Sequence, residues 1–216
     1  MEYLDVVDET GCPTGQTVER SVAHAQGIRH RTAHVWLVRR RAGRLQVLLQ
    51  KRSENKDSNP GKYDISSAGH IPAGVEWKPS ALRELQEELG VNAREEQLHY
   101  CGQRRFFHQA AFHGKPFLDR QVSNVYLLWL DWDEKKFTLQ KEEVSEVRWL
   151  DFEACMQDVK AGTIPNCIAP EELELVQRPA RPEKQGKYRM KPQGCCAQRC
   201  CGTGNNDSRR GENNVV

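Results

Sequence analysis

One segment, from Ala68 to Val91, constrains the fold of this chain more than any other, because it joins a glycine-containing loop to a predicted helix. Its sequence is AGHIPAGVEWKPSALRELQEELGV. Pro79 suits the first turn of that helix, where its missing N–H removes no hydrogen bond, and Gly90 suits the left-handed residue just past the end. The segment therefore predicts a helix of about three turns.

The predicted helix has one acidic side and one apolar side. Residues three and four positions apart share a side, because each residue turns a helix by about 100°. By this spacing the acidic side holds Glu84, Glu87 and Glu88, and the apolar side holds Leu82, Leu85 and Leu89. We expect the leucines to pack into a core and the carboxylates to face a site.

The chemistry of the acidic side points to a divalent metal. Like charges four residues apart on a helix repel one another unless a cation lies among them. Arg83, four positions before Glu87, relieves part of this repulsion, and a metal would relieve more. Mg²⁺ prefers oxygen ligands and usually takes one or two carboxylates together with substrate phosphate oxygens. The alternative interpretation is a solvated acidic helix face with no ligand.

The segment resembles the signature of the Nudix hydrolases, G-x5-E-x7-R-E-U-x-E-E-x-G-U, in which U is apolar. The positions that match in type and spacing are Gly69, Arg83, Glu84, Leu85, Glu87, Glu88, Gly90 and Val91. One position departs, because Val75 stands where the signature has its first glutamate and Glu76 follows one place late. The resemblance implies that Gly69 and the three glutamates hold Mg²⁺ or Mn²⁺, and that Arg83 belongs to the catalytic centre.

The resemblance also implies a reaction, the hydrolysis of a diphosphate linkage in a nucleoside diphosphate derivative or a similar small molecule. Outside the helix, Glu143 is the expected additional glutamate that completes the site or acts as general base, with Glu142 as the alternative. Lys51 and Arg52, at the end of a predicted strand, are expected to bind the diphosphate, unless they are exposed charges only. A non-catalytic nucleotide-binding module, in which Val75 marks a loss of metal binding, is the alternative function.

Several further segments resemble the Nudix branch related to type I isopentenyl-diphosphate isomerases. They are LDVVDETGCPTG near the start, LLQKRS at 48–53, PGKYD at 60–64 and SAGH at 67–70, and the similarity covers residues 3–177. Those isomerases carry a catalytic cysteine two residues before the histidine of the last segment, where this chain has Ala68. Because a methyl group cannot transfer a proton, isomerase activity is disfavoured.

The same resemblance implies a second metal site formed by His24, His30 and His70, for which Asp119 and Gln121 are the available oxygen ligands. Three imidazoles can hold a transition metal. The alternative is that these histidines are ordinary polar residues, with His70 bound to the loop near the substrate. His70 is therefore also a predicted substrate-binding residue.

Around the helix, apolar segments predict strands at 4–7, 35–38, 45–50, 98–107, 122–130 and 144–150. The segments at 35–38 and 45–50 are expected to form a hairpin, and their near-continuous apolar character is typical of a sheet covered on both faces. Helices are expected at 151–159, with Asp151 as N-cap, and at 170–177. Turns are expected at 8–15 and 111–117, whereas residues 18–30 are polar and weakly patterned. We predict an α/β fold, a Nudix-type α/β/α sandwich with a mixed central sheet and a loop–helix catalytic motif.

The domain is expected to end near residue 177, because apolar residues nearly vanish in the segment 178–216, which is predicted to be disordered. That segment contains four clustered cysteines, for which metal binding is the alternative: Cys195, Cys196, Cys200 and Cys201. The other cysteines are scattered singly and are expected to be reduced thiols: Cys12, Cys101, Cys155 and Cys167.

Charge and hydropathy argue against a nucleic-acid polymer or a membrane as a partner of this chain. The formal net charge of +2 is small and is not gathered on one element, so a nucleic-acid polymer is not an expected partner. No apolar run is long enough to span a bilayer, and residues 1–10 carry four acidic side chains and no basic one, unlike a signal peptide. A cytoplasmic location is therefore expected. Substrate identity is open: Phe106, Phe107 and Phe112 are available to stack on a base or to fill a core.

Overall fold

A computed structural model describes residues 1–112 and 114–177 of the chain. Its strands are β1 Tyr3–Val7, β2 Pro13–Glu19, β3 His30–Arg41, β4 Arg44–Arg52, β5 Tyr63–Asp64, β6 Ser67–His70, β7 His99–Phe112, β8 Lys115–Trp129 and β9 Val144–Asp151. Its α-helices are α1 Arg20–Gln26, α2 Trp77–Leu89, α3 Phe152–Ala161 and α4 Pro170–Val176. Short 3-10 helices span Glu95–Gln97 and Glu134–Lys136. None of the described helices is long and apolar enough to cross a membrane.

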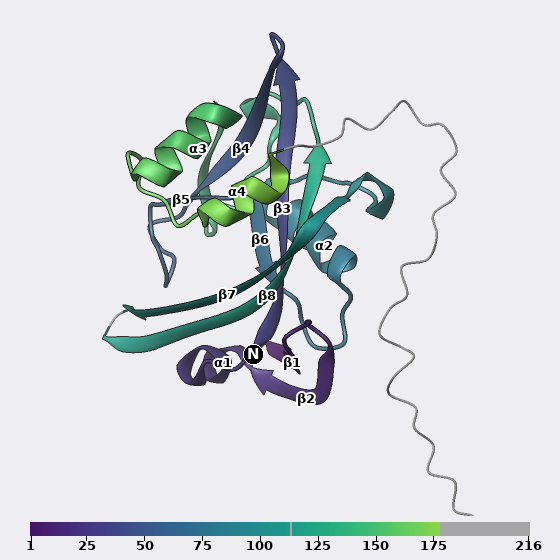
Figure 1. Ribbon diagram of the computed structural model, residues 1–216, viewed down its shortest axis with the longest axis vertical. Coiled ribbons are helices and arrows are strands. Elements are labelled where there is room, and N and C mark those ends of the chain that lie inside the picture. The colour runs from purple at the N-terminus through teal and green to yellow at the C-terminus, as the bar shows by residue number, and fades with distance from the viewer. Residues whose placement is uncertain (113, 178–216) are drawn as a thin grey trace, which may run out of the picture. The chain divides into compact units, whose positions relative to one another are not determined.

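The centre of the described part is a mixed, seven-stranded sheet (Figure 1). The strand order is β5-β4-β3-β8-β7, with β6 paired to β3 and β9 paired to β4. β3 and β8 run parallel, and the other pairs in this sheet are antiparallel. A separate two-stranded sheet consists of β1 and β2.

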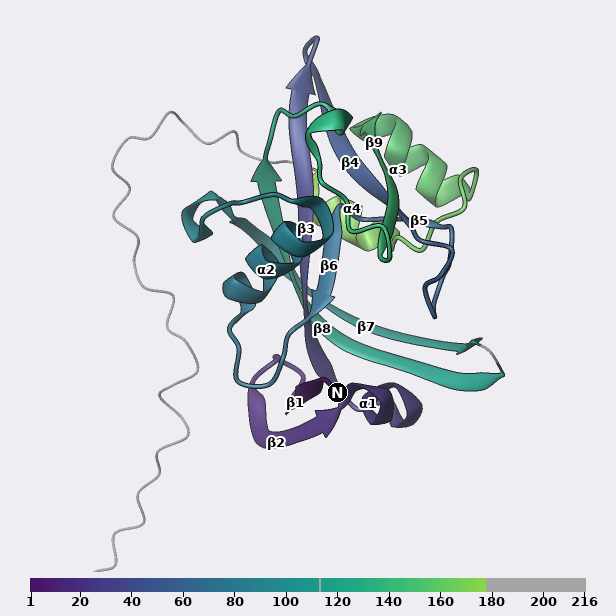
Figure 2. The same ribbon diagram turned by 180° about the vertical axis from the view of Figure 1, so that it is seen from behind.

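Helices cover both faces of the sheet, α2 on one face and α3 with α4 on the other, as Figures 1 and 2 show. Successive residues of β3 point to opposite faces, so Val35 packs with Leu85 of α2, whereas Trp36 packs with Phe152 of α3 and Leu173 of α4. The predicted α/β sandwich with a sheet covered on both sides is confirmed.

The organising helix is confirmed as well. α2 begins at Trp77, so Pro79 lies in its first turn, and Gly90 closes it with a left-handed φ of 68°. Leu85 and Leu89 are fully buried, and Leu82 packs half-buried against the same core. The amphipathic spacing thus places the leucines as predicted.

Two N-terminal segments differ from the sequence-based expectation. The turn predicted at 8–15 is present at 9–11 but ends earlier, because β2 begins at Pro13, and residues 18–30, for which no element was predicted, contain α1. In α1 only Ala23 and His24 are buried, so the short helix has no apolar stripe that a sequence could reveal.

The hairpin of β7 and β8 is longer than predicted, and its strands run through most of the expected turn at 111–117. Their outer parts pair in register while remaining largely exposed, so continuous apolar character was a poor guide to their length.

Asp151 holds the N-cap position of α3, but its carboxylate accepts hydrogen bonds from Arg44 and Gln46 instead of capping the helix. The predicted disorder and metal binding of residues 178–216 lie outside the described residues.

Candidate active site

A large cavity of about 1650 Å³ opens beside α2 and continues past β6 to the opposite face of the sheet. Most of the predicted site residues line it: His24, Arg52, Gly69, His70, Arg83, Glu84, Glu87, Glu88, Glu142 and Glu143. Lys51 does not line it, because its strand neighbours are Tyr63 of β5 and Glu146 of β9. His30 is fully buried behind the lining.

The acidic side of α2 packs directly against β6. A methyl group on Gly69 would overlap the carboxyl group of Glu84, so only glycine allows this approach. Glu88 is buried, Glu84 has 15% of its side chain exposed, and Glu87 has 46% exposed. The three carboxylates therefore form a graded series from the interior to the cavity opening.

Arg83 lies on the same side of the helix and contacts two of the three glutamates. Its Nη1 donates a hydrogen bond of 2.6 Å to Glu87, as the i, i+4 spacing predicts, and its Nη2 donates one of 2.5 Å to Glu84. These contacts fix the outer two carboxylates. Arg83 donates its hydrogen bonds to Glu84 and Glu87 and none to Glu88.

Burial of these carboxylates favours their protonated forms. Burial raises the pKa of Glu84, and the pKa of Glu88 rises to about 8 through burial and the neighbouring charge of Glu84. In the described part of the chain, Glu88 Oε2 is buried without a hydrogen-bond partner. An orphaned oxygen next to a second buried carboxylate is a place that a proton or a cation would stabilise.

The departure at Val75 has a structural counterpart. Arg31 donates a 3.0 Å hydrogen bond to the carbonyl oxygen of Val75, pairs with Asp5 at 2.7 Å and lies over the Trp77 ring. Asp5 also accepts a hydrogen bond from the backbone N–H of Gly74. We call Asp5, Arg31 and Trp77 the loop clamp, since together they hold the loop that leads into α2.

Glu76, the residue after the missing signature carboxylate, lies apart from the cavity. It is the N-cap residue of α2, it is exposed, and neither it nor Val75 lines the cavity. The signature residues that do line it are Gly69, Arg83 and the three helix glutamates.

Basic residues at the end of β4 and in the loop that follows it line the cavity as well. Lys56 of the loop forms an ion pair with Glu143, and Arg52, the last residue of β4, pairs with Asp64 at 3.2 Å. Lys56 was missed by sequence reasoning, although a lysine in a loop rich in Asn, Ser and Pro before a glycine motif was a usable signal.

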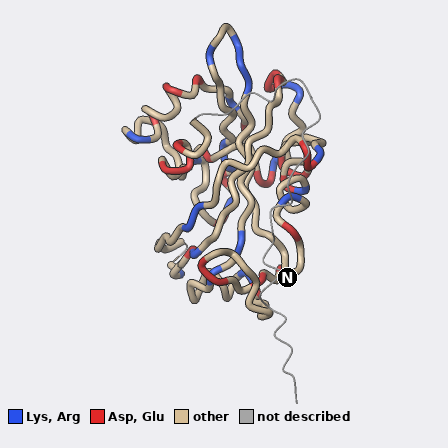
Figure 3. Tube along the Cα trace, turned by 45° about the vertical axis from the view of Figure 1, so that its right-hand side comes forward, with Lys and Arg blue, Asp and Glu red and all other residues tan. Residues whose placement is uncertain are grey.

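Figure 3 shows basic and acidic segments interspersed over the described trace, in keeping with the small net charge.

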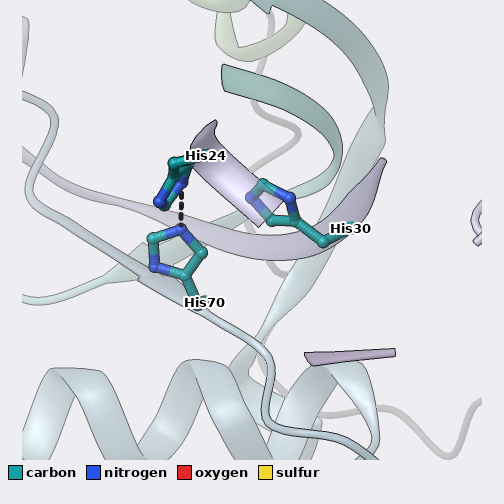
Figure 4. A group of neighbouring side chains, drawn as sticks. All are labelled: His24, His30 and His70. Carbon is teal, nitrogen blue, oxygen red and sulfur yellow. Dashed lines mark hydrogen bonds between the residues drawn. The ribbon is translucent and has the colours of Figure 1, made fainter. Parts of the chain in front are cut away.

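The three histidines predicted to form a second metal site lie together, and Figure 4 shows their rings facing one another. One ring nitrogen of each of His24, His30 and His70 lies within 4.8 Å of the others. Asp119 Oδ1 lies 3.7 Å from Nε2 of both His24 and His30. Gln121 donates a 2.7 Å hydrogen bond to Asp119 Oδ2 and so acts as a support for that carboxylate.

The cluster favours neutral imidazoles. Burial is the largest cause that lowers the pKa of each histidine, to about 3 for His24. Burial also raises the pKa of Asp119. His30 Nε2 and Asp119 Oδ1 are buried without a hydrogen-bond partner within the described ranges. His24 Nε2 and His70 Nε2 share a hydrogen bond of 3.3 Å, so one of the two carries a proton that a metal would displace. Neutral imidazoles and an unpartnered carboxylate oxygen are a donor set that a transition metal takes.

A further polar centre in the cavity was not predicted from the sequence. Glu172 of α4 is only 1% exposed and is bonded to His34 and Trp36 of β3, with Arg104 of β7 beside it. The pattern PEELELV gave no signal, because an acid near the start of a helix is ordinary.

Comparison with known proteins places this site in a family. Residues 28–167 match the family model described as NUDIX domain. The chain is 40% identical over 154 residues to Nudix hydrolase 3 of Arabidopsis thaliana, covering 70% of this chain but only 19% of that longer protein. It is 31% identical over 150 residues to the uncharacterised Nudix hydrolase YfcD of Escherichia coli, covering 69% of this chain and 73% of the relative. The fold resembles the crystal structure of DR0079 from Deinococcus radiodurans, with a TM-score of 0.58, 22% identity and coverage of 83% and 100% of the two chains.

Proposed function

This chain belongs to the Nudix hydrolase family, and from that premise we propose that it hydrolyses the diphosphate linkage of a nucleoside diphosphate derivative or a similar compound, with Mg²⁺ or Mn²⁺ as cofactor. The observation that carries the proposal is the buried pair Glu84 and Glu88 in a large cavity. Among the described residues, Glu88 Oε2 lacks any hydrogen-bond partner. A buried carboxylate in that state costs free energy that a bound cation recovers.

The donor set fits a hard divalent cation. Glu84, Glu87 and Glu88, with the carbonyl oxygen of Gly69, would hold it through oxygen atoms only, as Mg²⁺ and Mn²⁺ prefer. Bound there, such a cation supplies charge neutralisation for the diphosphate and lowers the pKa of a water molecule.

The protein's own residues then divide the remaining tasks. Arg83 keeps Glu84 and Glu87 in place through its two hydrogen bonds. Glu143 is proposed as the general base that accepts a proton from the attacking water, with Glu142, which also lines the cavity, as the alternative. Lys56 forms an ion pair with Glu143 and so helps to hold that carboxylate in position.

Recognition of the diphosphate is assigned to the basic side of the cavity. Arg52 lines it with a guanidinium that the protein already holds in place, since Nε and Nη2 donate to Ser58 and Nη1 donates to Asp64. His70 is proposed to contact the substrate from β6. Lys51 lies away from the cavity lining, so its predicted role in phosphate binding loses support.

We also propose that the chain is related to the isomerase-like branch of the family and holds a second, transition metal at His24, His30 and His70. Support comes from the close approach of the three rings and from the unpartnered Asp119 oxygen beside them. Isomerase activity remains disfavoured, because Ala68 stands in the cavity where a proton-transferring cysteine would be needed. Metal analysis of purified protein before and after His24→Ala tests this site directly.

A non-catalytic nucleotide-binding module is the second candidate function. It is favoured by one observation, that the Val75 position offers the cavity no carboxylate and is instead fixed by the loop clamp. The cytoplasm is proposed as the compartment, with support from the thiols Cys101, Cys155 and Cys167, which form no disulfide within the described residues.

A chromatographic screen of diphosphate compounds, with and without Mg²⁺ or Mn²⁺, distinguishes these functions. Metal-dependent turnover of a nucleoside diphosphate derivative is the expected result. Binding of the same compounds without turnover would support the binding module, and conversion of isopentenyl diphosphate to its isomer would overturn the assignment of a hydrolase.

A further inference from the structure

The polar centre around Glu172 lies in the same cavity as the α2 glutamates but faces α4, on the other side of the sheet. Both oxygens of Glu172 accept from His34 Nδ1, at 2.9 and 3.0 Å, and Oε1 also accepts from Trp36 Nε1 at 3.0 Å. Arg104 Nε lies 3.2 Å from Oε2. One carboxylate from α4 thus accepts hydrogen bonds from His34 and Trp36 of β3 and forms an ion pair with Arg104 of β7.

Arg104 and Phe106 form one wall of this centre. The Arg104 guanidinium carbon lies 4.4 Å from the centroid of the Phe106 ring. For the terminal nitrogens of Arg104, the described residues provide no hydrogen-bond partner. Along β7 both side chains are half-buried and line the cavity, whereas their neighbours Arg105 and Phe107 are exposed and do not. Because alternate residues of β7 face the cavity, its wall presents the Arg104 guanidinium stacked on the Phe106 ring, with the terminal nitrogens of Arg104 as donors.

His34 completes the wall from β3. Because Nδ1 is bound to Glu172, its other nitrogen is held toward the cavity lining, 3.3 Å from the hydroxyl group of Thr32. That nitrogen is hydrogen-bonded to Thr32, so the wall offers the terminal donors of Arg104 and the aromatic surface of Phe106, with the His34 ring beside them.

The charge of this wall decides what it can bind. The positive charge of Arg104 is already matched by Glu172, and a second phosphate would have to approach that buried carboxylate. A saturated hydrocarbon would leave the free donors without partners. A flat ring with oxygen or nitrogen acceptors satisfies the donors and stacks on the aromatic surface.

We propose that Arg104, Phe106 and His34 form a subsite for the planar, acceptor-bearing ring of the substrate, such as a nucleobase, and that Glu172 is the residue that positions them. The inference rests on the proposed function in one respect, that the diphosphate lies at the α2 glutamates. The ring then lies across β6 from the diphosphate, in the same cavity.

Two matched pairs of variants test the subsite. Arg104→Met and Phe106→Leu change the wall, and Arg105→Met and Phe107→Leu make the same changes on the exposed side of the strand. Calorimetry would measure binding of non-hydrolysable methylene analogues of ADP and UDP, with methylenediphosphonate as the ligand that lacks a ring. The wall variants should bind the nucleoside analogues more weakly than the wild type does, by about tenfold or more. They should change methylenediphosphonate binding by less than about twofold, and the control variants should change neither ligand.

The subsite would be overturned if the wall variants lost equal affinity for ligands with and without a ring. It would also be overturned if the wall and control variants lost equal affinity for the nucleoside analogues. No binding of either nucleoside analogue by the wild-type protein would overturn it too. If wild type binds the analogues with this selectivity but hydrolyses no diphosphate, the hydrolase proposal fails and the subsite stands. If it hydrolyses a nucleoside diphosphate derivative with Arg104→Met and Phe106→Leu unimpaired, the subsite fails and the hydrolase proposal stands.

Glu172→Gln tests the positioning role. This substitution should weaken binding of the nucleoside analogues and leave binding of methylenediphosphonate unchanged. In the double variant with Arg104→Met, the loss of binding free energy should be smaller than the sum of the two single losses. Additive losses, or equal weakening of both ligands, would show that Glu172 supports the fold alone.

Discussion

Glu88 and Glu172 are both buried glutamates on helices that flank the sheet, and both line the same cavity, yet their surroundings are opposite. Burial would raise the pKa of Glu172, but His34 and Arg104, with further hydrogen bonds, hold it below its ordinary value. Glu88 has burial and the charge of Glu84 acting together, and its pKa rises to about 8. One carboxylate is neutralised within the protein, and the other is not.

The difference separates an acid that is paired within the protein from an acid that we propose binds a cation. The partners of Glu172 come from β3 and β7, so that α4 is tied to the sheet by charge as well as by apolar packing. Ser67 and the charge of Lys56 offset only part of the effect of burial on Glu88, whose Oε2 has no hydrogen-bond partner among the described residues. Natural proteins rarely leave such a group alone, which supports the proposal that a cation binds there.

The largest effect is expected where the completed ion pair is broken. Glu172→Gln leaves Arg104 without its counter-charge in a buried setting, and we expect the free energy of unfolding to fall by about 3 kcal/mol. Urea denaturation measures this. Glu174→Gln, at an exposed ion pair with Lys160 on the same helix, is the control and should cost less than about 1 kcal/mol.

Catalysis should respond to the other carboxylates. Glu88→Gln and Glu87→Gln each keep the size of the side chain but remove a charge that the metal needs, so kcat should fall by about 10²-fold or more. Steady-state assays at saturating Mg²⁺ test this, with the exposed Glu76→Gln as the control. Turnover close to that of the wild type would show that the substituted glutamate is not a ligand.

The raised pKa of Glu88 predicts a pH dependence of stability in metal-free protein. The folded state holds a proton on Glu88 that the unfolded chain releases between its ordinary pKa of 4.5 and about 8, so stability should fall as pH rises through that window. Melting temperatures in EDTA should therefore drop several degrees more for wild type than for Glu88→Gln between about pH 5 and pH 8. Identical pH profiles for the two proteins would contradict the unpaired state of Glu88.

The smallest effect concerns the position where the signature is broken. Val75→Glu should lower the Mg²⁺ concentration for half-maximal activity only a few-fold, because residue 75 lies outside the cavity lining and its carbonyl oxygen is held by Arg31. Glu76→Gln should leave that concentration unchanged. A rise in the metal requirement of Glu76→Gln would show that this exposed glutamate reaches the site after all.

The sequence predicted what depends on spacing along one element. The sides of α2, its proline and glycine ends, and the Arg83–Glu87 contact all follow from the period of a helix, which a short segment encodes completely. The meeting of His24, His30 and His70 was expected only through a family resemblance, since those residues lie on three separate elements.

Contacts between distant segments could not be predicted in the same way. His34 and Glu172 are 138 residues apart, and Lys56 and Glu143 are 87 apart, so their pairing depends on how the sheet brings strands and loops together. Local propensity also failed at α1, where burial of only Ala23 and His24 leaves no periodic signal. The loop clamp was missed for the same reason, because nothing in the sequence pairs Asp5 with Arg31, which lies 26 residues away.

The central claim is that the α2 glutamates form a site that an external cation completes. Its most direct test is electron paramagnetic resonance of Mn²⁺ titrated into metal-free protein, carried out in the His24→Ala background so that the histidine cluster does not compete for the ion. We predict that His24→Ala protein binds Mn²⁺ and that adding Glu88→Gln weakens this binding by about tenfold or more, whereas adding Glu76→Gln does not change it. Equal Mn²⁺ binding with and without Glu88→Gln would contradict the account.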